Sequence, residues 1–253
     1  MAKRYLPPAA VLMLIALLWQ AGASAFRVPA WILPSPGLIL RTLWTDRALL
    51  AANAGVTLEE TLIGFTLALA AGLGLALLVR WSPLCERALW PLLVGSQTVP
   101  VPAIAPALVI WLGFGLAPKV VVVGLVCFFP IVVATVDGLR AVDRELIDTL
   151  RTLGASPRRI FAEVQWPAAV PSVYSGVKIA IAFSVIGAVL GEWVGASAGL
   201  GYTMIRASSQ LLTARVFAAI AVLSVMALVL FSATTLLERR SLRWKVQAGG
   251  NLR

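Results

Sequence analysis

The stretch DRELIDTLRTLGASPRRIFAEVQWPAAVP, residues 143–171, is a charged interruption in an otherwise strongly apolar chain. Asp143 is a suitable N-cap, and leucines follow it at helical spacing. Gly154 is a natural C-terminal stop, because glycine adopts the left-handed conformation that often ends a helix. The first half of this stretch therefore predicts a short amphipathic helix.

The second half predicts another short helix. Ser156 and Pro157 suit its start, since proline at the first helical position has no N–H group to leave unpaired. We expect this helix to end before Trp166-Pro167, because the residue preceding a proline is disfavoured in helical conformation. The two helices would form a helix-turn-helix elbow outside the bilayer. By local pattern alone, an ordinary polar loop is the alternative.

The composition of the whole chain indicates an integral membrane protein. Of its 253 residues, 60% are hydrophobic and only 13% are charged. Such values lie outside the range of soluble domains. The chain contains no His and only two cysteines, Cys85 and Cys127, which excludes His-based acid/base catalysis, His-ligated haem and the usual zinc sites. We expect no metal site and no catalytic residue.

Six apolar segments predict an all-α polytopic fold, and between them lies the elbow of residues 143–171. The division expected is an N-terminal membrane helix with an external amphipathic segment (1–56), a core of five membrane helices (57–240) and a basic tail (241–253). A cleaved signal peptide is the alternative for the first segment. Gly64, Gly72 and Gly74 are expected to allow close helix contacts. The predicted spans are Leu6–Trp19 continuing toward Phe26, 57–79, 88–112, 120–136, 172–193 and 216–237.

The net charge of +10 is distributed as topology signals rather than as a nucleic-acid-binding face. Basic residues lie at the ends of apolar segments, and most of them fall on the side that holds both termini and the elbow. The positive-inside rule then places both termini and the elbow in the cytoplasm.

Residues 148–167 resemble the EAA motif of permeases from bacterial ABC importers. In that family Glu-Ala-Ala is followed by three residues, Gly, nine residues and Ile-x-Leu-Pro. Here the spacing from Gly154 to Pro167 is kept. The departures are Asp148 for Glu, Thr149 and Leu150 for the alanines, Val164 for Ile and Trp166 for Leu.

Other motifs are similar to the nitrate, sulfonate and taurine permease group, including LPSP at 33–36 and GLGY at 199–202. Within it, residues 96–100, 111–115 and 191–202 look most like permeases for pyrimidine precursors of thiamine. The resemblance implies a type I ABC importer permease in the bacterial inner membrane. Its solute would be a hydroxymethylpyrimidine or formylaminopyrimidine, and the alternatives are a sulfonate, taurine or nitrate.

The resemblance also implies the partners: a second permease copy in a homodimer, two cytoplasmic ATPase subunits and an external solute-binding protein. No G-x-x-x-x-G-K-[ST] loop occurs in the chain, so ATP-Mg would belong to the ATPase partner and no cofactor to this chain. A channel or passive facilitator is the alternative of another class. An intramembrane enzyme is a poor alternative, because no base accompanies the polar residues in the spans.

The elbow is the expected ATPase-coupling site. Leu150, Leu153 and Phe161 would seat in a groove of the ATPase, while Arg158 and Arg159 would meet acidic neighbours. The residues expected to carry coupling are Asp148, Leu150, Leu153, Gly154, Ala155, Ser156, Arg158, Arg159, Phe161 and Pro167.

A second set of residues is expected to line the translocation pathway. Gln97 and Thr98 lie in the middle of a span whose prolines predict a bend or break, and a polar group there needs a pathway or another helix. Interhelical packing is the alternative for them, and for Ser184. Glu192 would recognise a ring amine or meet the docking protein, with a surface carboxylate as the alternative. The pathway residues are Gln97, Thr98, Pro100, Pro102, Ser184 and Glu192.

Overall fold

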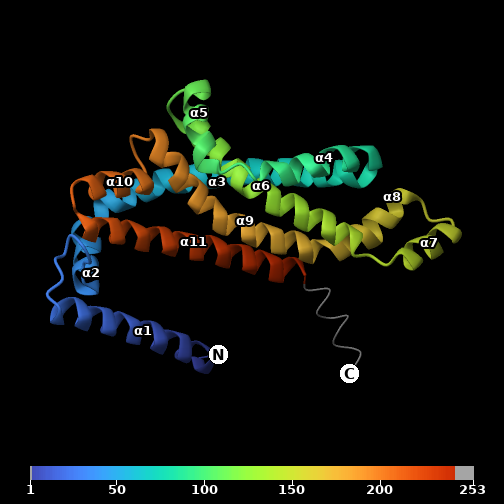
Figure 1. Ribbon diagram of the computed structural model, residues 1–253. Helices are drawn as coiled ribbons and strands as arrows, with labels where there is room; N and C mark the ends of the chain where they lie inside the picture. The colour runs from blue at the N-terminus through green and yellow to red at the C-terminus, as the bar shows by residue number, and fades with distance from the viewer. Residues whose placement is uncertain (1, 243–253) are drawn as a thin grey trace.

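The computed structural model describes residues 2–242, which form helices joined by short turns and contain no strand. The longest helices lie side by side, with the elbow at one end of them (Figure 1). The helices are α1 (Ala2–Ala25), α2 (Pro36–Thr45), α3 (Arg47–Trp81), α4 (Pro83–Ser96), α5 (Val101–Leu112), α6 (Leu116–Arg140), α7 (Arg144–Thr152), α8 (Pro157–Ile160), a π-helical segment η1 (Phe161–Gln165), α9 (Trp166–Gly195), α10 (Leu200–Ser209) and α11 (Thr213–Ser241).

The centre of the fold is a close packing of α3, α6 and α9. Glycines make this possible: a Cβ atom at Gly64 of α3 would lie 2.5 Å from Cβ of Val123 on α6. Gly72 meets Ile131 in the same way, as the sequence predicts. The prediction for Gly74 is wrong, because nothing lies within 4 Å of its Cβ position. Small residues thus bring the helix backbones together where membrane packing depends on close contact.

Four described helical segments are long and apolar enough to cross a membrane: α3, α6, the joined α8–η1–α9 segment (Pro157–Gly195) and α11. The α4–α5 pair is apolar enough to form a fifth span but bends by 99° between its two helices. The bend confirms the interruption that the prolines predict. The apolar part of α1, Ala10–Ala25, is shorter, so the expected count of six spans is not confirmed.

The N-terminal part differs from the expected division. The amphipathic segment ends with α2 at Thr45, and α3 already begins at Arg47, so the boundary expected after residue 56 falls inside a membrane helix. The end of α1 packs on the rest of the fold through Trp19, whose ring centroid lies 5.6 Å from that of Phe217 on α11. The basic tail expected over 241–253 lies outside the described residues from 243 onward.

The first elbow helix forms as the sequence predicts. The Asp143 side chain accepts a hydrogen bond from the Glu145 N–H group (2.9 Å) at the start of α7. Gly154, with φ of +84°, follows the helix end. The Ser156 hydroxyl then accepts from the Arg159 N–H group (3.3 Å), and Pro157 begins α8.

The predicted end of the second elbow helix before Trp166-Pro167 is wrong. The helix instead widens into η1, where the Trp166 N–H group donates to the Phe161 carbonyl oxygen five residues earlier. A π-helical turn tolerates the missing N–H group and the ring of Pro167, so the chain continues into α9 without a loop. The elbow is therefore joined directly to the membrane-spanning helix.

Candidate functional site

The elbow helix α7 presents two chemically different faces. Its apolar face is largely open to solvent: Leu146 is 47% exposed and Leu153 is 76% exposed. Leucines exposed on the same face of a short helix form an apolar surface that a partner could cover. Beside this face is a hollow of about 270 Å³ that unites five of the predicted coupling residues, and its lining comprises Leu150, Leu153, Gly154, Ala155, Arg159, Ile160, Glu163 and Val164.

Two other predicted coupling residues, Phe161 and Arg158, do not line this hollow. Phe161 packs inward, with its ring centroid 5.5 Å from Trp81 and 6.2 Å from Trp166, so it does not extend toward a partner's groove. Arg158 and Arg159 are exposed, and Arg159 pairs with Glu163 of the elbow at 3.0 Å. These contacts make Phe161 part of the joint between elbow and membrane core.

Asp148, Ser156 and Pro167 complete the predicted coupling set. Asp148 pairs with Arg151 on the exposed surface of α7 at 3.0 Å. Ser156 caps α8, and Pro167 lies in the first turn of α9. Ser156, which is exposed, and Pro167 therefore help to shape the elbow, and their part in coupling stays a prediction.

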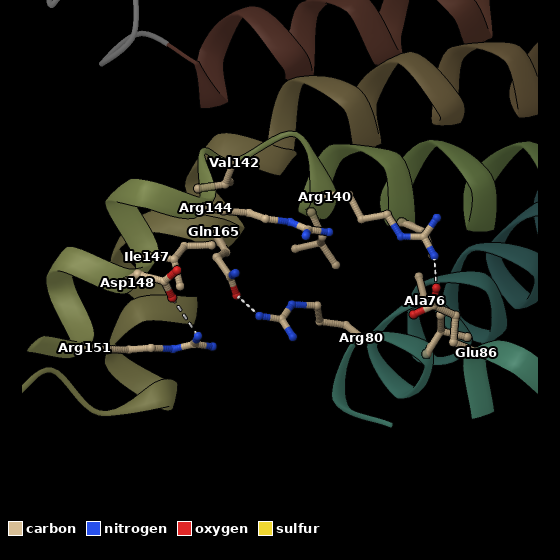
Figure 2. Close-up of a pocket in the computed structure, with 13 residues that line it drawn as sticks. Ala76, Arg80, Glu86, Arg140, Val142, Arg144, Ile147, Asp148, Arg151 and Gln165 are labelled. Carbon is tan, nitrogen blue, oxygen red and sulfur yellow. Dashed lines mark hydrogen bonds and ion pairs between the residues drawn. The ribbon is translucent and has the colours of Figure 1, made fainter. Parts of the chain in front are cut away.

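The charged face of α7 looks toward the membrane core across a pocket of about 550 Å³ (Figure 2). Arg80, from the last turn of α3, donates from Nη2 to Oε1 of the buried Gln165 at 2.7 Å. Arg140, at the end of α6, pairs with Glu86 of α4. The first contact joins the elbow to the end of α3, and the second joins the end of α6 to α4. No local sequence pattern predicts the Arg80–Gln165 pair, because its members are 85 residues apart.

A second pocket, of about 780 Å³, lies beside the break between α4 and α5. Of the predicted pathway residues, Gln97 and Pro100 line it. Thr98 and Pro102 are exposed at the same break but do not line it. Ser96, Val99, Val101 and Ile104 line it from the same side. The wall from α6 and α9 is mostly apolar and comprises Leu125, Val126, Phe128, Phe129, Pro130, Val133, Ala134, Asp137, Ile179 and Phe183.

Asp137 is the one acidic side chain in that lining, and sequence reasoning missed it. Asp137 follows directly after the span expected to end at Val136, so the sequence pattern places it in the loop after that span. In the structure α6 continues to Arg140, which places Asp137 within the helix and against the pocket. An acid inside an apolar segment was the signal that could have found it.

Ser184 does not reach this pocket or any open surface of the chain. It is fully buried, and its hydroxyl donates to the Ile181 carbonyl oxygen at 2.7 Å. The expected place in the pathway is therefore corrected to interior packing. A small hydroxyl residue is accommodated there because it satisfies its own hydrogen bond along the helix.

Glu192 is only 1% exposed, which excludes the alternative of a surface carboxylate. Its Oε1 accepts from the Thr57 hydroxyl (2.6 Å), and its Oε2 accepts from the N–H groups of Gly201 (2.5 Å) and Tyr202 (3.1 Å). The carboxylate thus satisfies N–H groups at the start of α10, where a helix leaves them unpaired. These contacts occupy Glu192 inside its own subunit.

Glu60 and Lys119 form a buried ion pair near Glu192. Lys119 Nζ lies 2.5 Å from Glu60 Oε1, and Glu60 is 1% exposed. Gly191, next to Glu192, packs on the Lys119 backbone. The sequence showed these charges only as residues near the ends of two spans. Among residues 2–242, no cluster of His, Cys, Asp or Glu could hold a metal ion.

Comparison with known proteins gives a consistent result. The family model for the binding-protein-dependent transport system inner membrane component matches residues 64–243. The chain is 41% identical over 240 residues to a "Probable ABC transporter permease protein" of Haemophilus influenzae, covering 94% of this chain and 98% of that protein.

Two further relatives have named substrates. The formylaminopyrimidine transport permease ThiX of Halalkalibacterium halodurans is 38% identical, with 95% of this chain and 96% of the relative covered. The riboflavin transport permease RibX of Chloroflexus aurantiacus is 39% identical, with 92% and 88% covered.

A solved structure supports the fold. The MetNI methionine ABC transporter, in an inward-facing conformation, matches with a TM-score of 0.58 and 20% identity, over 82% of this chain and 98% of that one.

Proposed function

The chain belongs to the family of inner membrane components of binding-protein-dependent transport systems, and we propose that it carries a pyrimidine precursor of thiamine into the cytoplasm. As a member of that family it is a multi-pass ABC permease subunit and not an enzyme. The family also implies a separate ATPase subunit and a solute-binding protein. Membership removes the alternative of a passive channel or facilitator.

The observation that carries the substrate proposal is the chemistry of the pocket beside the α4–α5 break. Its polar groups include the Gln97 amide and the Asp137 carboxylate, and no basic side chain lines it. An aminopyrimidine offers N–H donors for a carboxylate and ring nitrogens for an amide. A sulfonate or nitrate would instead meet a negative charge in apolar surroundings without a compensating cation.

The relatives also support a pyrimidine precursor as the substrate. The sequence resemblance of residues 191–202 to pyrimidine-precursor permeases and the 38% identity to the formylaminopyrimidine permease both favour a formylaminopyrimidine or hydroxymethylpyrimidine. Sulfonate, taurine and nitrate remain the second candidates because the same sequence motifs occur in that group. Riboflavin, named for another relative, shares the heteroaromatic character and is the third compound to test.

We further propose a homodimer whose two copies enclose the pathway, with two ATPase subunits at the elbows. The pocket is open on one side, where Ile179 and Phe183 of α9 are 50% and 43% exposed. A second copy would cover this apolar surface and supply the facing wall. The elbow would then lie in the cytoplasm with both termini, and its exposed leucines would seat in the ATPase groove.

An uptake experiment tests the substrate. The host is a thiamine auxotroph that cannot synthesise the pyrimidine precursor of thiamine. It expresses this chain together with the ATPase and solute-binding subunits of its transport system. Growth on nanomolar formylaminopyrimidine or hydroxymethylpyrimidine supports the proposal. The contrary outcome is uptake of labelled taurine or an alkanesulfonate with none of either pyrimidine. A vector without the permease gene is the control for passive entry.

A further inference from the structure

The pocket behind the elbow is strongly basic, although the transport cycle gives it no role. Four arginines line it against two acids, which leaves an excess of two positive charges. Two of the arginines are neutralised: Arg140 pairs with Glu86, and Arg151 pairs with Asp148. The other two, Arg80 and Arg144, have no carboxylate within 4 Å in residues 2–242.

The two unneutralised arginines, Arg80 and Arg144, line the same pocket from different helices. Figure 2 shows Arg144 and Arg151 reaching in from α7, while Arg80 reaches toward them from the end of α3. Arg80 is held in this position by Gln165, a neutral partner that leaves its charge uncompensated. Several planar guanidinium groups converging on one space are suited to the oxygens of a phosphate group.

The location of the pocket indicates where such a phosphate would come from. Arg80 and Arg140 are in the last turns of membrane-spanning helices, so the pocket lies at the level of the membrane surface on the elbow side. Trp81 and Trp90 lie beside it, with the Arg80 and Arg140 guanidinium carbons 5.8 and 5.3 Å from their ring centroids. Tryptophan is enriched at the headgroup level of membranes.

Apolar surface for an acyl chain adjoins Arg80 in the sequence. Leu78, Trp81 and Leu84, around the turn from α3 to α4, are 49%, 50% and 77% exposed. A headgroup in the pocket would place its acyl chains along such residues. The Arg144 face of α7 is also distinct from its leucine face, so a lipid here leaves the leucines free for the ATPase.

We propose that the pocket lined by Arg80, Arg144 and Arg151 binds the phosphate group of an anionic phospholipid, which then joins the elbow to the membrane surface. Basic pockets between membrane helices take anionic headgroups in this manner. Because Arg80 comes from α3 and Arg144 from α7, one bridging phosphate would connect the elbow to the membrane core beside the Arg80–Gln165 hydrogen bond.

The test is native mass spectrometry of the purified, delipidated permease, titrated separately with phosphatidylglycerol and phosphatidylcholine of the same acyl chains. The first phosphatidylglycerol is expected to bind about tenfold more tightly than the first phosphatidylcholine. Arg144→Gln is expected to weaken phosphatidylglycerol binding about tenfold. Arg240→Gln is the matched control: it removes one exposed arginine from the end of α11, on the elbow side and outside the pocket lining, and should change nothing.

Arg80→Gln is a second variant with the same expected direction, measured together with its melting temperature because Arg80 also supports Gln165. Equal phosphatidylglycerol binding by wild type, Arg144→Gln and Arg240→Gln would overturn the proposal. Displacement of the lipid by millimolar inorganic phosphate would assign the pocket to a free anion instead. Loss of ATPase retention by Arg144→Gln with unchanged lipid binding would make the pocket an ATPase contact.

Discussion

Lys119 on α6 and Glu60 on α3 form an ion pair of 2.5 Å that is almost completely removed from solvent. Nearby, the Glu192 carboxylate on α9 accepts a hydrogen bond from the Thr57 hydroxyl on α3. The same carboxylate caps α10 by accepting from the Gly201 N–H group. The two contacts fix the relative positions of the three central helices at the end opposite to the elbow. Charges so deeply buried are stable only while each keeps its partner.

Lys119→Met should therefore destabilise the permease by about 3–5 kcal/mol, because it leaves the Glu60 charge buried without a cation. Thermal unfolding in detergent measures the effect. The double variant Lys119→Met with Glu60→Leu should recover most of the loss, since it removes both charges. As a control, Arg151→Met breaks the exposed pair with Asp148 and should cost no more than about 1 kcal/mol. Equal losses for the two single lysine and arginine variants would contradict the structure.

Two glycines on α3 make a matched pair for testing helix packing. Gly64→Ala places a methyl group against Val123, whereas Gly74→Ala meets nothing within 4 Å. The first change should destabilise the protein by about 1–3 kcal/mol through overpacking. The second should be neutral or stabilise slightly, because alanine is the better helix former. Unfolding of both variants under the same conditions checks this, and a reversed order would argue against the α3–α6 contact.

Leu153→Asp tests the apolar face of the elbow. The residue is 76% exposed, so the permease should keep its melting temperature, while retention of the ATPase subunit on a tagged permease should fall at least about tenfold. Leu212→Asp is the control at the opposite end of the molecule, between α10 and α11. ATPase retention that is equal in both variants would remove the elbow leucines from the coupling site.

Asp137→Asn tests the proposed pathway. Losing the charge should lower uptake of the pyrimidine by about tenfold, since a hydrogen bond to a charged acceptor contributes roughly 1.5–3 kcal/mol. ATPase retention and melting temperature should not change, because Asp137 lies on an exposed part of α6. Ser184→Ala, at a buried position, is the comparison and should transport normally. Uptake that depends on Ser184 but not on Asp137 would contradict the pathway drawn from the pocket.

The elbow and its caps could be predicted from the sequence because they depend on local chemistry. Asp143, Gly154 and Ser156-Pro157 specify turns and helix starts through backbone contacts within a few residues. The α4–α5 break was foreseeable for the same reason, since its prolines remove backbone donors. The continuation of the helix through Pro167 could not be predicted. The residue before a proline usually avoids the helical conformation, and here the π-helical turn η1 overrides that preference.

The long-range pairs could not be predicted from the sequence. Glu192 is 135 residues from Thr57, and Arg80 is 85 residues from Gln165. Hydropathy shows where Glu60, Lys119 and Glu192 sit along a span but not which way each side chain turns. The same limit explains Ser184, which periodicity cannot assign to the interior or to a pathway because α9 is apolar on most of its surface.

Residues 157–195 form a continuous helical path of 39 residues, about 58 Å long at 1.5 Å per residue. One end of this path is the elbow, and the other end holds Glu192 and, through it, the start of α10 (Figure 1). No loop separates the two ends, and η1 is the one irregular stretch in the path. A displacement of the elbow at one membrane surface would therefore move the other end of the same helix. The fraction of that displacement that is transmitted would depend on the stiffness of η1, residues Phe161–Gln165.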